Sequence, residues 1–149
     1  MVKTEPLPLH HSWPLYEQPL RFELGAILNS VVTDAIAPDS VGAVGLYHAG
    51  CWECDLADNS LTWSGGVYDL FGLPRGVAMT REQAAALYAE PSRSAMERLR
   101  AYAIRHARGF TLDAEIQPVV GPRRWMRLIA APEQVAGRVT RLHGIKLAL

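Results

Sequence analysis

The stretch GCWECDLADNSLTWSGGVYDLFGL, residues 50–73, decides the fold. Within it, Trp52, Cys54 and Leu56 alternate with acidic residues, and this period of two predicts a strand with one buried face. The polar run ADNS predicts a turn, and a second short strand completes a hairpin over residues 50–63. The folded region is therefore predicted to begin with an antiparallel strand pair.

Three helices are predicted after this hairpin. A short helix fits between Ser64, which can cap its start, and Gly72, which can end it. The capping boxes T-x-x-Q at Thr80 and S-x-x-E at Ser94 each predict a further helix, and the second of these ends at Gly109. Four residues share one stripe of this long helix: Met96, Leu99, Ala103 and His106.

The period returns to two after the long helix. Phe110, Leu112, Ala114 and Ile116 alternate with polar residues, and two more strands are predicted over residues 124–131 and 138–147, each preceded by a turn. Three consecutive hairpin-linked strands, added to the first hairpin and the helices, favour an α+β fold with an antiparallel sheet and helices on one side.

The composition fits one domain with a modest extension. The chain has 149 residues, of which 49% are apolar and 20% charged, so it can build one core. The formal net charge is zero, which gives no general attraction to nucleic acid or to membranes. Residues 1–22 lack the apolar segment of a signal peptide, and no apolar run approaches the roughly 18 residues of a membrane span. We therefore expect a soluble, cytoplasmic protein.

The chain divides into two predicted regions. Residues 1–44 form an N-terminal arm, irregular over its proline-containing first twenty residues, and then an amphipathic helix over residues 21–37. Residues 45–149 form the α+β domain.

The order of these elements, together with the motifs they carry, resembles a PAS domain. The subgroup it resembles has the motif G-x-W-x-x-D-L, then W-S, then L-F-G-L. The run GPRRW at residues 121–125 is similar to the family's G-x-x-R-W, and Gly137, Arg141 and Gly144 match its final G-x-x-x-R-x-x-G. The resemblance covers about residues 45–147. The residues that match the first motif are Gly50, Trp52, Asp55, Leu56, Trp63, Ser64, Leu70, Phe71, Gly72 and Leu73.

The resemblance implies a five-stranded antiparallel sheet with helices on one face. It also implies a sensory or protein-interaction domain in signal transduction, which binds a small ligand, a partner protein or both and has no catalytic output. The sequence differs from the family at two places. AEPSR at residues 89–93 stands where the family often has H-P-E-D-R, and the last strand reads GIKLAL instead of running into D-I-T, the junction to an output domain.

The C-x-x-C pair, Cys51 and Cys54, does not predict a redox or zinc site. Residues three apart on a strand point to opposite faces with Cα atoms about 10 Å apart, whereas a disulfide needs Cα atoms within about 7 Å. A structural zinc site usually needs a second ligand pair, and the chain has no other cysteine. We expect Cys54 to share the core face with Trp52, and Cys51 to lie on the opposite face.

The cofactor stays open. The related LOV group binds flavin through a reactive cysteine in a helix, but residues 66–90 contain no cysteine, so no covalent flavin is expected. Haem-binding PAS domains use a histidine on the long helix, where His106 lies. The position of His106 in the last turn has a plainer explanation, because a cationic or hydrogen-bonding side chain stabilises the carbonyl end of a helix. Haem binding through His106 is therefore not expected.

Members of the PAS family often hold a small cavity between the sheet and the helices. The candidate lining residues here are Trp52, Cys54, Tyr68, Leu99, Tyr102, Leu112 and Ile116. Two alternatives stay open. One is a dimerising adaptor whose pocket is filled by its own side chains. The other is a small pocket enzyme of the cone-shaped α+β barrel type, with Asp113 or Glu115 as acid or base, although alternation places both opposite Leu112.

A homodimer through residues 21–37 is predicted. The apolar stripe of this helix needs cover, and so does the sheet face that turns away from the domain's own helices. Met126 and Leu128 are expected to point opposite to Trp125 and Arg127. A two-fold interface would bury both surfaces, whereas the alternative is a helix that covers its own sheet in a monomer.

Overall fold

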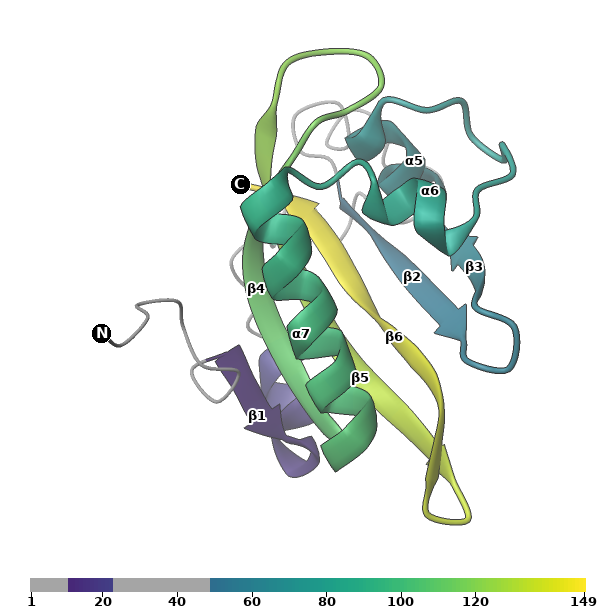
Figure 1. The fold of residues 1–149 in the computed structure, drawn as a ribbon, viewed down its shortest axis with the longest axis vertical. Helices are drawn as coiled ribbons and strands as arrows, with labels where there is room; N and C mark the ends of the chain where they lie inside the picture. Colours follow the sequence, from purple (N-terminus) through teal and green to yellow (C-terminus); the bar gives the residue numbers. More distant parts are fainter. Residues whose placement is uncertain (1–10, 23–48) are drawn as a thin grey trace.

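The computed structural model describes residues 11–22 and 49–149, and these form one six-stranded antiparallel sheet with helices against one face (Figure 1). The strand order across the sheet is β1-β4-β5-β6-β2-β3. The strands are β1 (Ser12–Pro14), β2 (Ala49–Asp55), β3 (Ser60–Trp63), β4 (Arg108–Ile116), β5 (Arg124–Val135) and β6 (Arg138–Ala148). The predicted α+β fold is confirmed, with β1 added to the five expected strands.

The helices pack on the inner face of the sheet, and α7 crosses it lengthwise in Figure 1. They are α5 (Gly65–Phe71), α6 (Arg81–Ala85) and α7 (Glu90–His106), and a 3-10 helix, η1 (Leu15–Glu17), follows β1. No helix among the described residues is long and apolar enough to cross a membrane.

The hairpin over residues 50–63 is confirmed. Trp52 of β2 is the register partner of Trp63 of β3, and β2 pairs on its other side with β6. The capping box of α6 is also confirmed, because the Thr80 side chain accepts a hydrogen bond from the Gln83 N–H and the Gln83 side chain accepts one from the Thr80 N–H. At α5, Ser64 occupies the cap position but its Oγ accepts from the Cys51 N–H instead, at 2.9 Å.

The predicted start of the long helix at Ser94 is wrong. Helix α7 begins at Glu90, with Ala89 as its cap and proline in the first turn, where a missing N–H costs nothing. Ser94 therefore lies inside the helix. At the other end, α7 stops at His106, and Ala107 adopts the left-handed conformation two residues before the predicted stop at Gly109.

The irregular arm predicted for the first twenty residues is wrong where the structure describes it. β1 pairs with the start of β4, and the buried ring of Trp13 covers the outer face of the sheet against Ile129 and Ala131. The Trp13 Nε1–H donates a hydrogen bond to Thr111 Oγ1 at 3.1 Å. Residues 23–37 of the predicted amphipathic helix, and the predicted boundary at residue 45, lie outside the described residues.

The two faces of the sheet differ as alternation predicts. Met126 and Leu128 are buried in the inner core, whereas Trp125 is 52% exposed on the outer face. Arg127, also on the outer face, forms a bidentate ion pair with Asp113 across β4 and β5. The inner face of the sheet therefore carries the main hydrophobic core.

Candidate functional site

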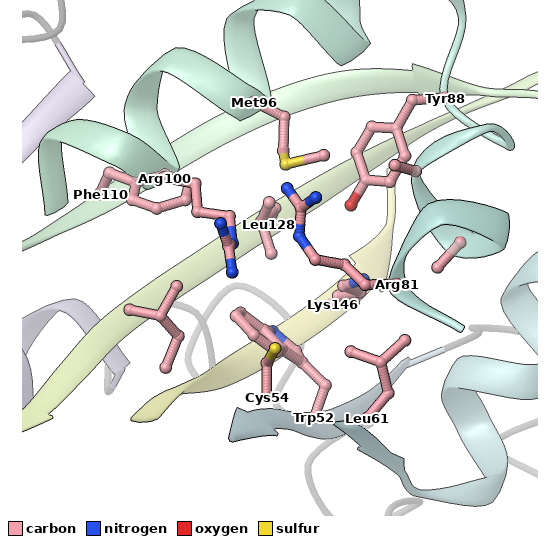
Figure 2. A pocket seen from close by; sticks show the side chains of 13 residues that line it. Trp52, Cys54, Leu61, Arg81, Tyr88, Met96, Arg100, Phe110, Leu128 and Lys146 are labelled. Carbon is pink, nitrogen blue, oxygen red and sulfur yellow. The ribbon is translucent and has the colours of Figure 1, made fainter. Parts of the chain in front are cut away.

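A small cavity lies between the inner face of the sheet and helices α6 and α7 (Figure 2). Its volume is about 60 Å³, which is enough to admit a very small molecule. The lining is mostly apolar, with three cationic side chains and no carboxylate. The lining residues are Trp52, Cys54, Leu61, Arg81, Ala84, Ala85, Tyr88, Met96, Arg100, Phe110, Leu128, Leu142 and Lys146.

Lys146 of β6 is the chemically unusual residue of this lining. Its side chain is buried, with 7% exposure, among apolar neighbours. Nζ lies over four aromatic rings, which we call the aromatic cage. The distances from Nζ to the ring centroids are 5.3 Å for Trp52, 5.4 Å for Trp63, 5.2 Å for Phe71 and 5.7 Å for Tyr88. At these distances each ring attracts a cation through its π face.

Four parts of the chain bring the cage together. β2 and β3 contribute Trp52 and Trp63 as register partners, and α5 contributes Phe71, which stacks on Trp63 at 5.2 Å. Tyr88 follows α6, and its ring lies 6.2 Å from that of Phe71. The cage thus joins the first hairpin to the helices, and Lys146 reaches it from the last strand.

The charge state of Lys146 is set by burial. Desolvation lowers the pKa of Lys146 to about 7, and the nearby thiol of Cys54 opposes this with a smaller upward effect. Among the described residues, no side-chain hydrogen bond or ion pair involves Nζ of Lys146. Because burial removes Nζ from bulk solvent, the charged ammonium is disfavoured, and an appreciable fraction of the amine is neutral near pH 7.

Two arginines reach into the same space from the helices (Figure 2). Arg81, the first residue of α6, forms an ion pair with Glu97 of α7. Arg100 of α7 donates a hydrogen bond to Asn59 Oδ1 in the β2–β3 turn, at 3.0 Å. Both guanidinium groups therefore have partners outside the cavity.

Tyr88 is a further polar residue of the lining. Burial, and secondly the charge of Glu97, raise the pKa of Tyr88, so its hydroxyl stays protonated.

The structure brings only part of the predicted lining together. Trp52 and Cys54 line the cavity, as neighbours on one face of β2. Leu99, Leu112 and Ile116 lie in the same hydrophobic core but not in the cavity wall. The other two predicted residues, Tyr68 and Tyr102, lie elsewhere.

Tyr68 packs at the margin of the core, edge-on to Trp63 with ring centroids 5.2 Å apart. Tyr102 points along α7 toward His106, with ring centroids 4.3 Å apart. His106 is exposed, although Met96, Leu99 and Ala103 are buried. Seven residues at about 100° each return His106 to the helix face of Leu99, as predicted from the stripe. Its exposure follows from its place as the last residue of α7 and not from a different face.

The two cysteines lie on opposite faces of β2, as predicted. Both are free thiols, Cys51 exposed and Cys54 buried. Within residues 11–22 and 49–149, no group of three or more His, Cys, Asp or Glu side chains is placed to hold a metal ion.

Sequence reasoning missed Lys146, although the signal was available. Leu142, Gly144 and Lys146 alternate with residues of the outer face, so the strand period places Lys146 beside the buried Leu142. Lysine is mostly an exposed residue type, so the residue type alone does not suggest a buried position. The sequence did not reveal Arg81 and Arg100 as lining residues, because their long side chains reach the cavity from helix positions that are only partly buried.

Comparison with solved structures shows the PAS fold. The chain is similar to the N-terminal domain of a diguanylate cyclase with a PAS/PAC sensor from Marinobacter aquaeolei, at 16% identity and a TM-score of 0.60, with 66% of this chain and 92% of that chain covered. It is similar to the LOV domain of a blue-light activated histidine kinase from Erythrobacter litoralis, at 21% identity and a TM-score of 0.56, with 67% and 94% covered.

A third similar structure is an RNA-binding Light-Oxygen-Voltage receptor, at 14% identity and a TM-score of 0.61. The match covers 68% of this chain but only 29% of that receptor, so the chain corresponds to one domain of a longer protein there. No protein-family model matches the chain, and no curated protein matches it.

Proposed function

We propose that this chain is a PAS-type sensory module that binds a small molecule in the cavity between the sheet and helices α6 and α7. The observation that carries the proposal is Lys146, a buried amine at the wall of that cavity whose Nζ lies over four aromatic rings. Perturbed titratable groups of this kind cluster at functional sites, because keeping them in a core costs stability.

The arrangement supports a sensing role. A ligand in the cavity would touch α6 and α7 on one side and β2, β5 and β6 on the other. Its binding energy would therefore depend on the distance between helices and sheet, and it would favour one distance over others. The similar structures belong to a diguanylate cyclase with a sensor and to a light-activated kinase, and we extend the sensory role to this chain by analogy of fold.

Mass spectrometry of the natively purified protein under non-denaturing conditions tests this proposal. We expect a small molecule to be retained, and we expect Ala84→Leu, which fills the cavity from α6, to abolish its retention. Val77→Leu is the matched control, since Val77 is exposed and away from the lining. If the intact protein carries no ligand and no small molecule raises its melting temperature, the sensory proposal fails.

A ligand-free dimerising adaptor is the second candidate. The cavity holds only about 60 Å³, and the Lys146 side chain already reaches the aromatic cage. This observation favours a pocket filled by the chain itself. The adaptor and the sensor predict different masses in the same measurement, because the adaptor is a dimer without any bound molecule.

The dimer itself is proposed to form through residues 21–37. The outer face of the sheet supports this, because it exposes Trp125 and carries a hollow of about 490 Å³ bordered by Phe22 and His143. Within the described residues, Trp13 and Phe22 already cover another part of this face.

Light scattering tests the dimer. We expect Leu28→Asp, on the predicted apolar stripe, to halve the mass, and Ser30→Asp beside that stripe to leave it unchanged. A monomeric parent protein at high micromolar concentration would show that the helix covers its own sheet instead.

We propose no catalytic output on this chain. The enzyme alternative needed Asp113 or Glu115 as acid or base, but Asp113 pairs with Arg127 on the outer face, and no carboxylate lines the cavity. Among the lining residues, Lys146 is the group on which such an enzyme would now have to depend.

A further inference from the structure

Lys146 is unusual among the cationic residues of this chain, nearly all of which are arginines. The sequence has thirteen arginines and two lysines, Lys3 and Lys146. Arginine is always charged, whereas lysine can lose its proton and become a nucleophile when it is buried. One of the two lysines thus occupies a position among the described residues where a neutral amine can form.

We propose that Lys146 forms an imine with a small aliphatic aldehyde or ketone that enters the cavity. This inference rests on the proposed sensory function and names its ligand class. The neutral Nζ adds to the carbonyl carbon and gives a carbinolamine. Loss of water then leaves a carbon–nitrogen double bond, so the amine and the carbonyl compound yield the imine and one molecule of water.

The aromatic cage favours the product over the charged starting amine. An ammonium group has three N–H donors, and the described residues offer Nζ no hydrogen-bond acceptor. A protonated imine has a single N–H, and its charge is spread over nitrogen and carbon. The ring faces of Trp52, Trp63, Phe71 and Tyr88 can still attract that charge. The free-energy cost of burying an iminium ion in this site is therefore smaller than that of burying an ammonium ion.

The rest of the lining sets the size and polarity of the carbonyl compound. The cavity is about 60 Å³, bordered by Leu61, Met96 and Leu128, which suits a chain of a few carbon atoms. The titratable and charged groups around it are Cys54 from β2, Tyr88, Arg81 from α6, and Arg100 from α7, with Glu97 bound to Arg81. The Tyr88 hydroxyl stays protonated and can donate a hydrogen bond to the carbonyl oxygen.

Reductive trapping with propionaldehyde tests the inference. Cyanoborohydride delivers hydride to an imine carbon and fixes it as a secondary amine, which peptide mass mapping then locates. At pH 7 an ordinary lysine is almost entirely protonated, so we expect Lys146 to acquire the propyl group at least about tenfold faster than Lys3. Label on Lys3 with none on Lys146 in the folded protein would overturn the inference.

Three controls make each result decisive. Urea-unfolded protein should label both lysines at similar rates, which shows that both peptides are detected. Lys146→Met should lose the label in the folded state, whereas Lys3→Arg should keep it on Lys146. A protein that retains a non-covalent small molecule but leaves Lys146 unlabelled would refute the imine and leave the sensory function standing. A labelled Lys146 in a protein whose stability propionaldehyde does not change would count against the sensory function.

Discussion

Nζ of Lys146 lies 5.3 Å from the ring centroid of Trp52, although the two residues are diagonal neighbours on adjacent strands and not register partners. Their partners in the ladder are Gly50 and Gly144. Neither glycine has a side chain, so the long amine and the indole can meet over the inner face of the sheet.

The stability of the fold should depend on the ionisation of Lys146. Its pKa is about 7 in the folded protein, below the ordinary lysine value near 10.5, so between these values the unfolded chain binds more protons. The free energy of unfolding should therefore rise with pH over this window, by about 1 kcal/mol per pH unit. Urea titrations at several pH values measure it, with Lys146→Met as the reference that removes this contribution. Equal pH slopes for the two proteins would contradict the prediction.

Lys146→Met should stabilise the protein at pH 6. There the parent protein must keep a charged ammonium among four rings, whereas methionine fills the space without a charge. By analogy with buried ion pairs replaced by apolar residues, we expect a gain of about 1–4 kcal/mol. Lys3→Met is the matched control and should change the melting temperature little. A loss of stability would mean that the cation–π contacts outweigh the desolvation of the amine.

Thr80 and Ser94 both begin capping-box motifs, but replacing each with alanine should change the stability differently. Thr80→Ala removes the side-chain cap of α6 and should cost about 1 kcal/mol. Ser94→Ala should be neutral or slightly stabilising, because Ser94 is exposed inside α7, where alanine is the better helix former. Thermal melts of the two variants compare them directly, and an equal loss would contradict the helix start at Glu90.

Gly109 should be required for the packing of Trp13. A Cβ atom at Gly109 would lie 2.2 Å from the Trp13 ring, so Gly109→Ala must displace either the ring or β4. We expect a loss of about 1–3 kcal/mol. The same substitution in a Trp13→Ala background should cost much less, and this double-mutant cycle isolates the contact. Additive losses would show that Trp13 does not lie over Gly109.

The two thiols should react at different rates. Cys51 is exposed and should be labelled by a thiol reagent in the folded protein, whereas Cys54 is buried and should react only after unfolding. Cys51→Ser should therefore abolish the fast phase, and Cys54→Ser should leave it intact. A disulfide between them, or one equivalent of bound zinc, would contradict the strand geometry of β2.

Periodicity predicted the elements that are long or strongly alternating. The strand at residues 110–116 and the hairpin at residues 50–63 were readable, because burial of one face imposes the pattern. The start of α7 was misplaced, since the S-x-x-E pattern at Ser94 also occurs inside a helix, and Pro91 is well tolerated in the first turn. β1 was missed because three residues are too few to show a period.

The candidate site was harder to predict, because it depends on contacts between elements distant in the sequence. Trp52 and Cys54 followed from the face of their own strand. Tyr102 was predicted to line the cavity, but Ala103 holds the buried position on that turn of α7. The cage around Lys146 joins β2, β3, α5 and Tyr88 after α6. No local sequence pattern specifies these long-range contacts.

The short strand β1 also determines where another chain can join the sheet. An uncovered edge strand offers free N–H and C=O groups that template aggregation or strand addition. β1 pairs with residues 108–110 of β4, and at its other end β4 is covered by the Ala89 N–H, which donates to the Glu115 C=O at 2.9 Å. Among the described residues, β4 is thus paired at both of its ends and leaves open only its middle on that side. A peptide that binds by backbone pairing would meet only short edge strands, the three residues of β1 or the four residues Ser60–Trp63 of β3.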